Sequence, residues 1–391
     1  MNPLSVPTRV LMGPGPSDVD PRVLAAMALP TIGHLDPAFI GVMEEVRSML
    51  QAVFGTENKL TIPMSGTGSA GMEAAMVNLV EPGDRVLVGV NGVFGGRLAE
   101  VAKRAGGEVV RVEQEWGKAL DPDAFRAAAA GRSFKVIALV HAETSTGVLQ
   151  DLDGFRGVAD ELGALLLIDA VTSLGGVPVE LDRFGVDAAY SGTQKCLSCP
   201  PGLAPLSYSD RAIAALEKRG TPPVSWYLDL QLIARYWLGT KESGGAARAY
   251  HHTAPINMVY GLHEALRVAL DEGLEARFAR HRRISDAFVA GISAMELPLP
   301  VAPSERLPQL TLIRVPDGVD EKAVRGRLLA EHSLEIGGGL GAFAGKAWRI
   351  GLMGSACTEA NARLCLGTLR SALGAEGASV DDPLPAFEAA L

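Results

Sequence analysis

The chain has 391 residues, of which 48% are hydrophobic, and its formal net charge is −9. This length predicts two or three domains with a large core, and the interspersed charges exclude a basic nucleic-acid surface and a polybasic membrane anchor. The first residues do not form a signal peptide, no apolar run is long enough to cross a membrane, and the 4 cysteines are too few for a disulfide framework. We therefore expect a cytoplasmic globular protein without nucleic-acid or membrane partners.

Apolar runs and helical periodicity alternate along the first half of the chain, after a turn-rich segment at residues 13–17. Helices are expected at residues 21–27, 37–54, 72–80, in a segment ending at 105, and at 121–130 and 155–163. Extended runs begin at residue 60 and span 85–90, 109–112, 134–140 and 164–170. Continuous apolar strands that alternate with helices predict a mostly parallel sheet covered by helices on both faces.

The loop between the first extended run and the helix at 72–80 has the composition of a phosphate site. Its Gly, Ser and Thr residues direct backbone N–H groups and hydroxyls toward the positive end of a helix dipole. Gly66, Gly68 and Gly71 also spell the GxGxxG dinucleotide motif. The following strand, however, ends in Asn91-Gly92 and lacks the acid that this motif needs. A phosphate site is therefore favoured, and a dinucleotide site stays open as an alternative.

Other functional side chains follow the predicted strands and would meet at one edge of the sheet, where open α/β sheets bind ligands. They are Phe94, Thr144, Asp169 and Lys195, beside the loop at residues 65–69. Phe94 is interpreted either as a loop anchor or as an aromatic plate stacked on a flat cofactor. A lysine and a carboxylate at one rim are what pyridoxal phosphate requires, for its Schiff base and its pyridinium nitrogen.

The last part of the chain has a different pattern. A long helix at 254–272 leads to an arginine-rich helix, and a small α+β domain follows, with strands at 309–315, 334–337 and 348–352 and helices at 321–331 and 359–373. We expect an N-terminal arm at 1–16, a large cofactor-binding domain at 17–270 and a small domain at 271–391. Arg349 stands in an apolar strand, and a buried arginine needs an anion, either a structural carboxylate or the carboxylate of a substrate.

Two pairs of metal-ligating residues are interpreted as non-functional. Cys196 and Cys199 form a CxxC without a partner pair, so we expect ordinary buried thiols. His251 and His252 would point in opposite directions on an extended segment and make a poor chelating pair. No metal is therefore predicted.

With these residues together, the chain resembles the class V aminotransferases of fold type I, and among them the alanine–glyoxylate and serine–pyruvate aminotransferases. The resemblance runs along nearly the whole chain. The motifs that carry it lie at residues 13–17, 65–69, 91–95, 143–150, 169–171, 191–195, 250–253 and 348–351.

The resemblance implies roles for individual residues. Lys195 corresponds to the Schiff-base lysine, Asp169 to the partner of the pyridinium nitrogen, and Phe94 to the ring stacker. Thr144 matches a hydroxyl beside the ring oxygen, and Arg349, with backbone near Gly13, matches the clamp for the substrate carboxylate. Further positions match cofactor contacts, and most of these are phosphate contacts: Thr67, Gly68, Ser69, Val171, Gln194, Tyr250 and Thr253. In the family, Tyr250 and Thr253 would reach the phosphate of the neighbouring subunit, which implies a homodimer with shared sites.

The implied reaction is a ping-pong transfer of an amino group from alanine or serine to glyoxylate or pyruvate. Residues 114–117 and 193–198 are also similar to ureidoglycine–glyoxylate aminotransferases, which remain an alternative. That group has asparagine where this chain has Tyr250, which favours alanine or serine. A cysteine desulfurase, a nicotinamide-dependent dehydrogenase and a non-catalytic scaffold are more distant alternatives.

Overall fold

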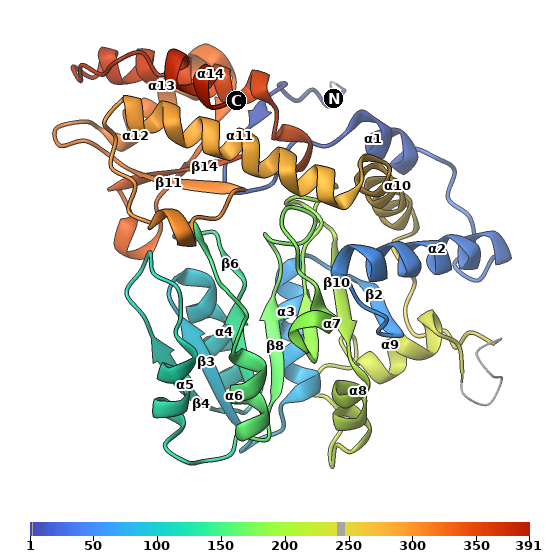
Figure 1. Ribbon diagram of the computed structural model, residues 1–391. Helices are drawn as coiled ribbons and strands as arrows, with labels where there is room; N and C mark the ends of the chain where they lie inside the picture. Colours follow the sequence, from blue (N-terminus) through green and yellow to red (C-terminus); the bar gives the residue numbers. More distant parts are fainter. Residues whose placement is uncertain (2, 241–246) are drawn as a thin grey trace.

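A computed structural model describes residues 1, 3–240 and 247–391. Its centre is a seven-stranded sheet in the lower part of Figure 1. In spatial order, the strands are β2 (Leu60–Ser65), β10 (Leu203–Tyr208), β9 (Ala188–Tyr190), β8 (Leu165–Asp169), β5 (Val136–Val140), β3 (Arg85–Val90) and β4 (Glu108–Glu113). Only β10 runs antiparallel to its neighbours. The predicted mostly parallel α/β sheet is therefore confirmed.

Helices pack against this sheet, and several begin at an aspartate N-cap followed by proline, as at Asp20, Asp36 and Asp121. The helices of this part of the chain are α1 (Pro21–Met27), α2 (Pro37–Phe54), α3 (Gly68–Leu79), α4 (Val93–Arg104), α5 (Pro122–Ala129), α6 (Phe155–Glu161), α7 (Leu181–Phe184), α8 (Asp210–Glu217), α9 (Leu230–Trp237) and α10 (Ile256–Glu272).

Helix α3 begins four residues earlier than the predicted helix at 72–80. Residues 68–71 are small, and this lets the first turn of α3 approach the sheet closely. A Cβ added at Gly71 would lie 3.0 Å from the side chain of Ala204 and 3.1 Å from that of Tyr190. Gly68 and Ser69 therefore belong to the first helical turn and not to the loop.

A smaller α+β unit lies above the sheet in Figure 1. It contains the antiparallel sheet β11 (Leu310–Arg314), β14 (Ala347–Gly351) and β13 (Gly337–Gly338). Its helices are α11 (Leu274–Ala294), α12 (Glu321–His332), α13 (Glu359–Ala375) and α14 (Leu384–Ala390). The strand expected at 334–337 is divided, because β12 (Leu334–Glu335) pairs instead with β1 (Val10–Leu11) of the N-terminal arm.

Two main hydrophobic cores match this arrangement. The first includes buried residues from Val23 to Leu266, and the second joins Met12 to residues from Ile284 to Phe387. The predicted boundary at residue 270 falls near the end of α10, between these cores, and stays a prediction. A short hairpin of β6 (Ala142–Glu143) and β7 (Val148–Leu149) extends from the end of β5 toward the smaller unit.

Candidate active site

A cavity of about 180 Å³ lies at the carboxyl ends of the parallel strands. Except for Tyr250 and Thr253, all of the predicted cofactor residues line it, namely Thr67, Gly68, Ser69, Phe94, Thr144, Asp169, Val171, Gln194 and Lys195. The sequence interpretation did not include six further lining residues, which are Met72, Arg97, Val140, Ala142, Thr172 and Tyr190. The structure thus brings the predicted rim together around one space.

One end of the cavity is the amino terminus of α3, which fits a phosphate. Thr67 is the N-cap residue and its side chain does not cap the helix, so the first N–H groups keep free hydrogen-bonding capacity. Gly68 is packed closely, since a Cβ there would lie 3.2 Å from Cγ2 of Val171. Gln194 Oε1 is buried without a hydrogen-bond partner. An orphaned polar atom beside a helix amino terminus is consistent with a bound polar group here.

Asp169 lies at the end of β8 and is almost fully buried. Its carboxylate accepts hydrogen bonds from the Tyr190 hydroxyl at 2.7 Å and from the Val171 N–H at 2.9 Å. Burial raises the pKa of Asp169 to about 6, so the carboxylate is mostly ionised at neutral pH. Tyr190 ends the neighbouring strand β9; within an apolar run, nothing in its sequence context distinguished it from a core residue.

Lys195 follows β9 and is 8% exposed. Burial, and then the nearby positive charge of Arg349, lower its pKa to about 8. Its ammonium donates a hydrogen bond to the carbonyl oxygen of Pro14. Gly15 has a φ of +106°, and a Cβ there would lie 2.5 Å from Lys195 Nζ. The turn-rich segment at residues 13–17 therefore contacts the lysine.

Phe94 occupies the first turn of α4, and its ring faces the cavity. The guanidinium of Arg97, one turn later, lies 5.0 Å from the centre of that ring. This cation–π contact covers part of the aromatic plate, so the surroundings fix Phe94 in its place. The stacking role of Phe94 stays a prediction.

Arg349 lies in the middle of β14 and is buried. Its Nε donates to the carbonyl oxygen of Gly338 at 2.8 Å, and one of its terminal nitrogens donates to that of Thr144 at 3.2 Å. Burial lowers its pKa to about 10. Within residues 1, 3–240 and 247–391, no carboxylate forms an ion pair with Arg349, so the structural salt bridge is not found. Gly13 lies beside Gly351, two residues further along β14.

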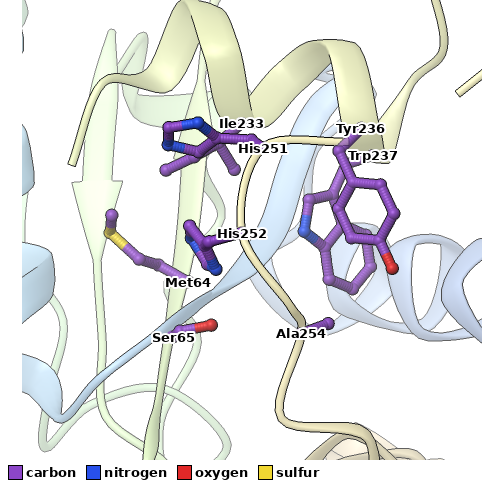
Figure 2. Close-up of a pocket in the computed structure, with 8 residues that line it drawn as sticks. All are labelled: Met64, Ser65, Ile233, Tyr236, Trp237, His251, His252 and Ala254. Carbon is purple, nitrogen blue, oxygen red and sulfur yellow. The ribbon is translucent and has the colours of Figure 1, made fainter. Parts of the chain in front are cut away.

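Tyr250 and Thr253 lie apart from this cavity. The Tyr250 hydroxyl is 3.4 Å from Oγ1 of Thr253, and the Tyr250 ring is exposed. Figure 2 shows the intervening His251 and His252 in a small pocket between α9 and the end of β2. Their ring centroids are 5.0 Å apart, so the expected opposite orientation is wrong, because this segment is not an extended strand. The role of Tyr250 and Thr253 stays a prediction.

The cysteines behave as expected for buried thiols. All four are free and buried, and burial raises their pKa values to about 11 or 12. Across the described residues, no group of three or more His, Cys, Asp or Glu side chains is arranged to hold a metal ion. No helix of the described chain is long and apolar enough to span a membrane.

Comparisons with known proteins agree with this geometry. Residues 12–347 match the model of the class-V aminotransferase family. The chain is 40% identical to the (S)-ureidoglycine–glyoxylate transaminase of Bacillus subtilis, over 97% of this chain and 94% of that protein. It is 41% identical to the alanine–glyoxylate aminotransferase of Callithrix jacchus, over 95% of this chain and 89% of that protein. The crystal structure of an alanine–glyoxylate aminotransferase from Nostoc sp. superposes with a TM-score of 0.92 and 48% identity, over 95% of this chain and 97% of that one. The chain therefore belongs to the class-V aminotransferase family and is a pyridoxal-phosphate-dependent enzyme.

Proposed function

We propose that this protein transfers an amino group from alanine, or serine, to glyoxylate or pyruvate by a ping-pong reaction. One observation carries the proposal: Lys195, Asp169, Phe94 and the amino terminus of α3 surround a single cavity. The buried Arg349, which has no ion-pair partner among the described residues, lies within electrostatic reach of Lys195. A carbonyl-capturing amine, an ionised acid, an aromatic plate and a phosphate-binding helix end match the parts of pyridoxal phosphate.

The residues of the chain divide the chemistry among them. Bound pyridoxal phosphate withdraws electrons from an attached amino acid and so acidifies its Cα proton. Lys195 holds and moves that proton, and a pKa of about 8 makes it both a base and an acid near neutral pH. Asp169, held by Tyr190 and the Val171 N–H, would pair as an anion with the protonated ring nitrogen of the cofactor. Phe94 would hold the ring of the cofactor by stacking, and Thr67, Gly68, Ser69 and Gln194 would hold its phosphate.

Arg349 binds the carboxylate that amino and 2-oxo acids share. Its guanidinium has two carbonyl partners and no carboxylate partner among the described residues, which leaves donors for a substrate anion. Thr144 contributes its carbonyl oxygen to hold Arg349, and its side chain lines the cavity. The proposed substrates are therefore small α-carboxylates.

A second amino donor, ureidoglycine, is favoured by a specific observation. The crystal structure of a ureidoglycine–glyoxylate aminotransferase from Bacillus subtilis superposes on the whole chain with a TM-score of 0.95 and 40% identity. Position 250 supports alanine or serine instead, because tyrosine does not offer the amide that would suit a ureido group. Glyoxylate is an acceptor under both hypotheses, and pyruvate is a further acceptor under the first.

A homodimer with shared active sites is part of the proposal. Large exposed apolar or aromatic side chains lie on neighbouring segments of one face: Leu29, Leu35, Trp226, Tyr227 and Tyr250. The Tyr250 ring is 5.0 Å from that of His34, and Tyr227 stacks on His252 at 4.3 Å, so these segments are in contact. An exposed apolar patch of this kind is typical of a protein interface. Light scattering should give twice the 41.0 kDa mass of the chain.

We also propose a cytoplasmic location, in accord with four unpaired cysteines.

The experiment that tests the function follows the absorbance of the purified holoenzyme. L-Alanine, L-serine and ureidoglycine are added singly, glyoxylate follows, and glycine is quantified by mass spectrometry. We expect the cofactor band to bleach with alanine or serine and to return with glyoxylate. Bleaching by ureidoglycine alone would select the second donor. A protein that does not take up pyridoxal phosphate, or a Lys195→Ala variant with unchanged spectrum and turnover, would overturn the proposal.

A further inference from the structure

Glu143 is a fully buried carboxylate next to the active site that the chemistry above does not use. It ends the short strand β6, directly before Thr144, and is 0% exposed. None of the described cations forms an ion pair with it. A buried carboxylate without a cation is costly unless several donors satisfy its oxygens. Its hydrogen bonds therefore show what it does.

All of its partners are donors, and they belong to two segments that reach the cofactor cavity. Oε2 accepts from the backbone N–H groups of Phe94 at 3.0 Å and Gly95 at 3.1 Å. Oε1 accepts from the N–H of Ser145 at 3.0 Å and from its hydroxyl at 2.6 Å. The serine oxygen in turn accepts from the N–H of Val93 at 2.9 Å. Burial raises the pKa of Glu143, and the hydrogen bonds donated by Ser145 and Gly95 oppose this shift because they favour the ionised form.

These bonds replace the missing cap of helix α4. The N-cap residue of α4 is Gly92, which has no side chain to offer. A Cβ at Gly92 would lie 2.4 Å from the carboxyl carbon of Glu143, so the glycine makes room for the carboxylate. The first three N–H groups of α4 thus bind to Glu143 and Ser145, which stand 48 to 52 residues further along the chain. A negative charge at this helix end is also favoured by the helix dipole.

The same carboxylate connects two functional groups. On one side, Glu143 fixes the helical turn that carries Phe94. On the other side, it fixes Ser145, and the carbonyl oxygen of the preceding Thr144 accepts a hydrogen bond from Arg349. Its charge also acts on Arg349, whose pKa it raises against the effect of burial. We propose that Glu143 is a positioning residue that holds the ring-stacking Phe94 and the substrate-binding Arg349 in register with each other; the inference rests on the proposed function for the roles of those two residues.

The test compares Glu143→Gln with the wild type and with Asp187→Asn. Glutamine keeps the size but replaces one acceptor oxygen with an NH₂ group, which faces donors. Asp187 is an equally buried carboxylate at the opposite ends of β8 and β9, bound to Arg156, the Leu166 N–H and the Ser209 hydroxyl. Its variant controls for the loss of a buried charge, because the hydrogen bonds and ion pairs of its side chain within the described part of the chain go to Arg156, Leu166, Ser209 and Arg211, none of which belongs to α4 or lines the cavity.

We expect three results for Glu143→Gln. In the protein without cofactor, hydrogen exchange at residues 93–95 should accelerate by about tenfold or more, because charge-assisted bonds are lost there. The Kd for pyridoxal phosphate should rise by about tenfold, with a smaller circular dichroism signal in the cofactor band. The KM for the amino donor should rise as well. Asp187→Asn should lower Tm but leave the exchange at 93–95 and the cofactor signal unchanged.

The inference would be overturned if Glu143→Gln kept the wild-type rate of hydrogen exchange at residues 93–95 and the wild-type Kd for pyridoxal phosphate. If Glu143→Gln does not fold, Ser145→Ala takes its place. It removes the acceptor for the Val93 N–H but keeps the carboxylate, so exchange at Val93 should accelerate, and unchanged exchange would overturn the inference. If the wild-type protein bound no pyridoxal phosphate, the proposed function would fail, while the exchange measurements on the cofactor-free protein would still decide the capping role of Glu143.

Discussion

The environment of Lys195 predicts how fast the cofactor-free protein captures pyridoxal phosphate at each pH. Only the neutral amine attacks a carbonyl carbon. With the ordinary lysine pKa of 10.5, about 0.1% of the amine is neutral at pH 7.5, whereas with a pKa of about 8 the neutral fraction is roughly a quarter. The capture rate should therefore rise with pH through a midpoint near 8. At pH 7.5 the amine should be about 200 times more available than that of an unperturbed lysine.

Stopped-flow absorbance from pH 6.5 to 10 measures this midpoint, and Nα-acetyl-lysine under the same conditions corrects for titration of the cofactor itself. The Arg349→Met variant separates the two causes of the low pKa. Burial of Lys195 remains, but the nearby positive charge is removed, so the midpoint should move to higher pH. A wild-type midpoint near 10, or a midpoint in Arg349→Met that moves to lower pH, would refute the reasoning.

Three further changes have clear expected outcomes. Gly15→Ala should weaken cofactor binding by roughly tenfold, because the added Cβ would displace the end of the Lys195 side chain from its place in the site. Gly83→Ala, with a similar φ of +89° and open space around it, controls for backbone strain. Arg349→Lys should raise the KM for alanine by roughly tenfold or more while the Kd for pyridoxal phosphate stays unchanged, because lysine keeps the charge but loses the planar fork; an unchanged KM would point to a structural arginine. His281 is buried and neutral with a pKa of about 3, so the unfolded chain takes up its proton first as pH falls below about 6.5. As the pH falls from 7 to 5, this proton uptake should lower the free energy of unfolding by about 2 kcal/mol. In denaturant titrations, the free energy of unfolding of His281→Gln should fall by less over the same interval.

Most of the fold could be predicted because its elements are local in sequence. Apolar runs and helical periodicity predicted helices α1–α6 and α10–α13 and strands β2, β3, β4, β5 and β8, but not the helices α7, α8, α9 and α14. Strand β10 was not predicted, since Pro205 interrupts its pattern. In the sheet it stands opposite Pro63, so two residues that lack a backbone N–H group face each other. The pairing of β1 with β12 joins residues more than 300 positions apart, and no local pattern can reveal it.

The cofactor cavity was predicted better than the residues that support it. Lys195, Asp169 and Phe94 follow predicted strands, so topology alone placed them at one edge of the sheet. Tyr190 and Arg97 line the same cavity but stand inside an apolar run and a helix, where their sequence context is that of core and surface residues. The capping role of Glu143 depends on the distance to α4, which only the folded chain defines.

The protein has a net charge of −9, yet its site must bind anions, so the cations of the site have to remain available for them. Two buried carboxylates lie close to two buried cations. Direct ion pairs between them would neutralise the cations and occupy their hydrogen-bond donors. Instead, each carboxylate is satisfied by uncharged donors, Asp169 by Tyr190 and Val171, and Glu143 by residues of α4 and Ser145. The two cations, Lys195 and Arg349, donate to carbonyl oxygens of Pro14, Gly338 and Thr144. Carbonyl oxygens hold a cation in place without neutralising it, so the lysine stays reactive and the arginine keeps its charge for the substrate carboxylate.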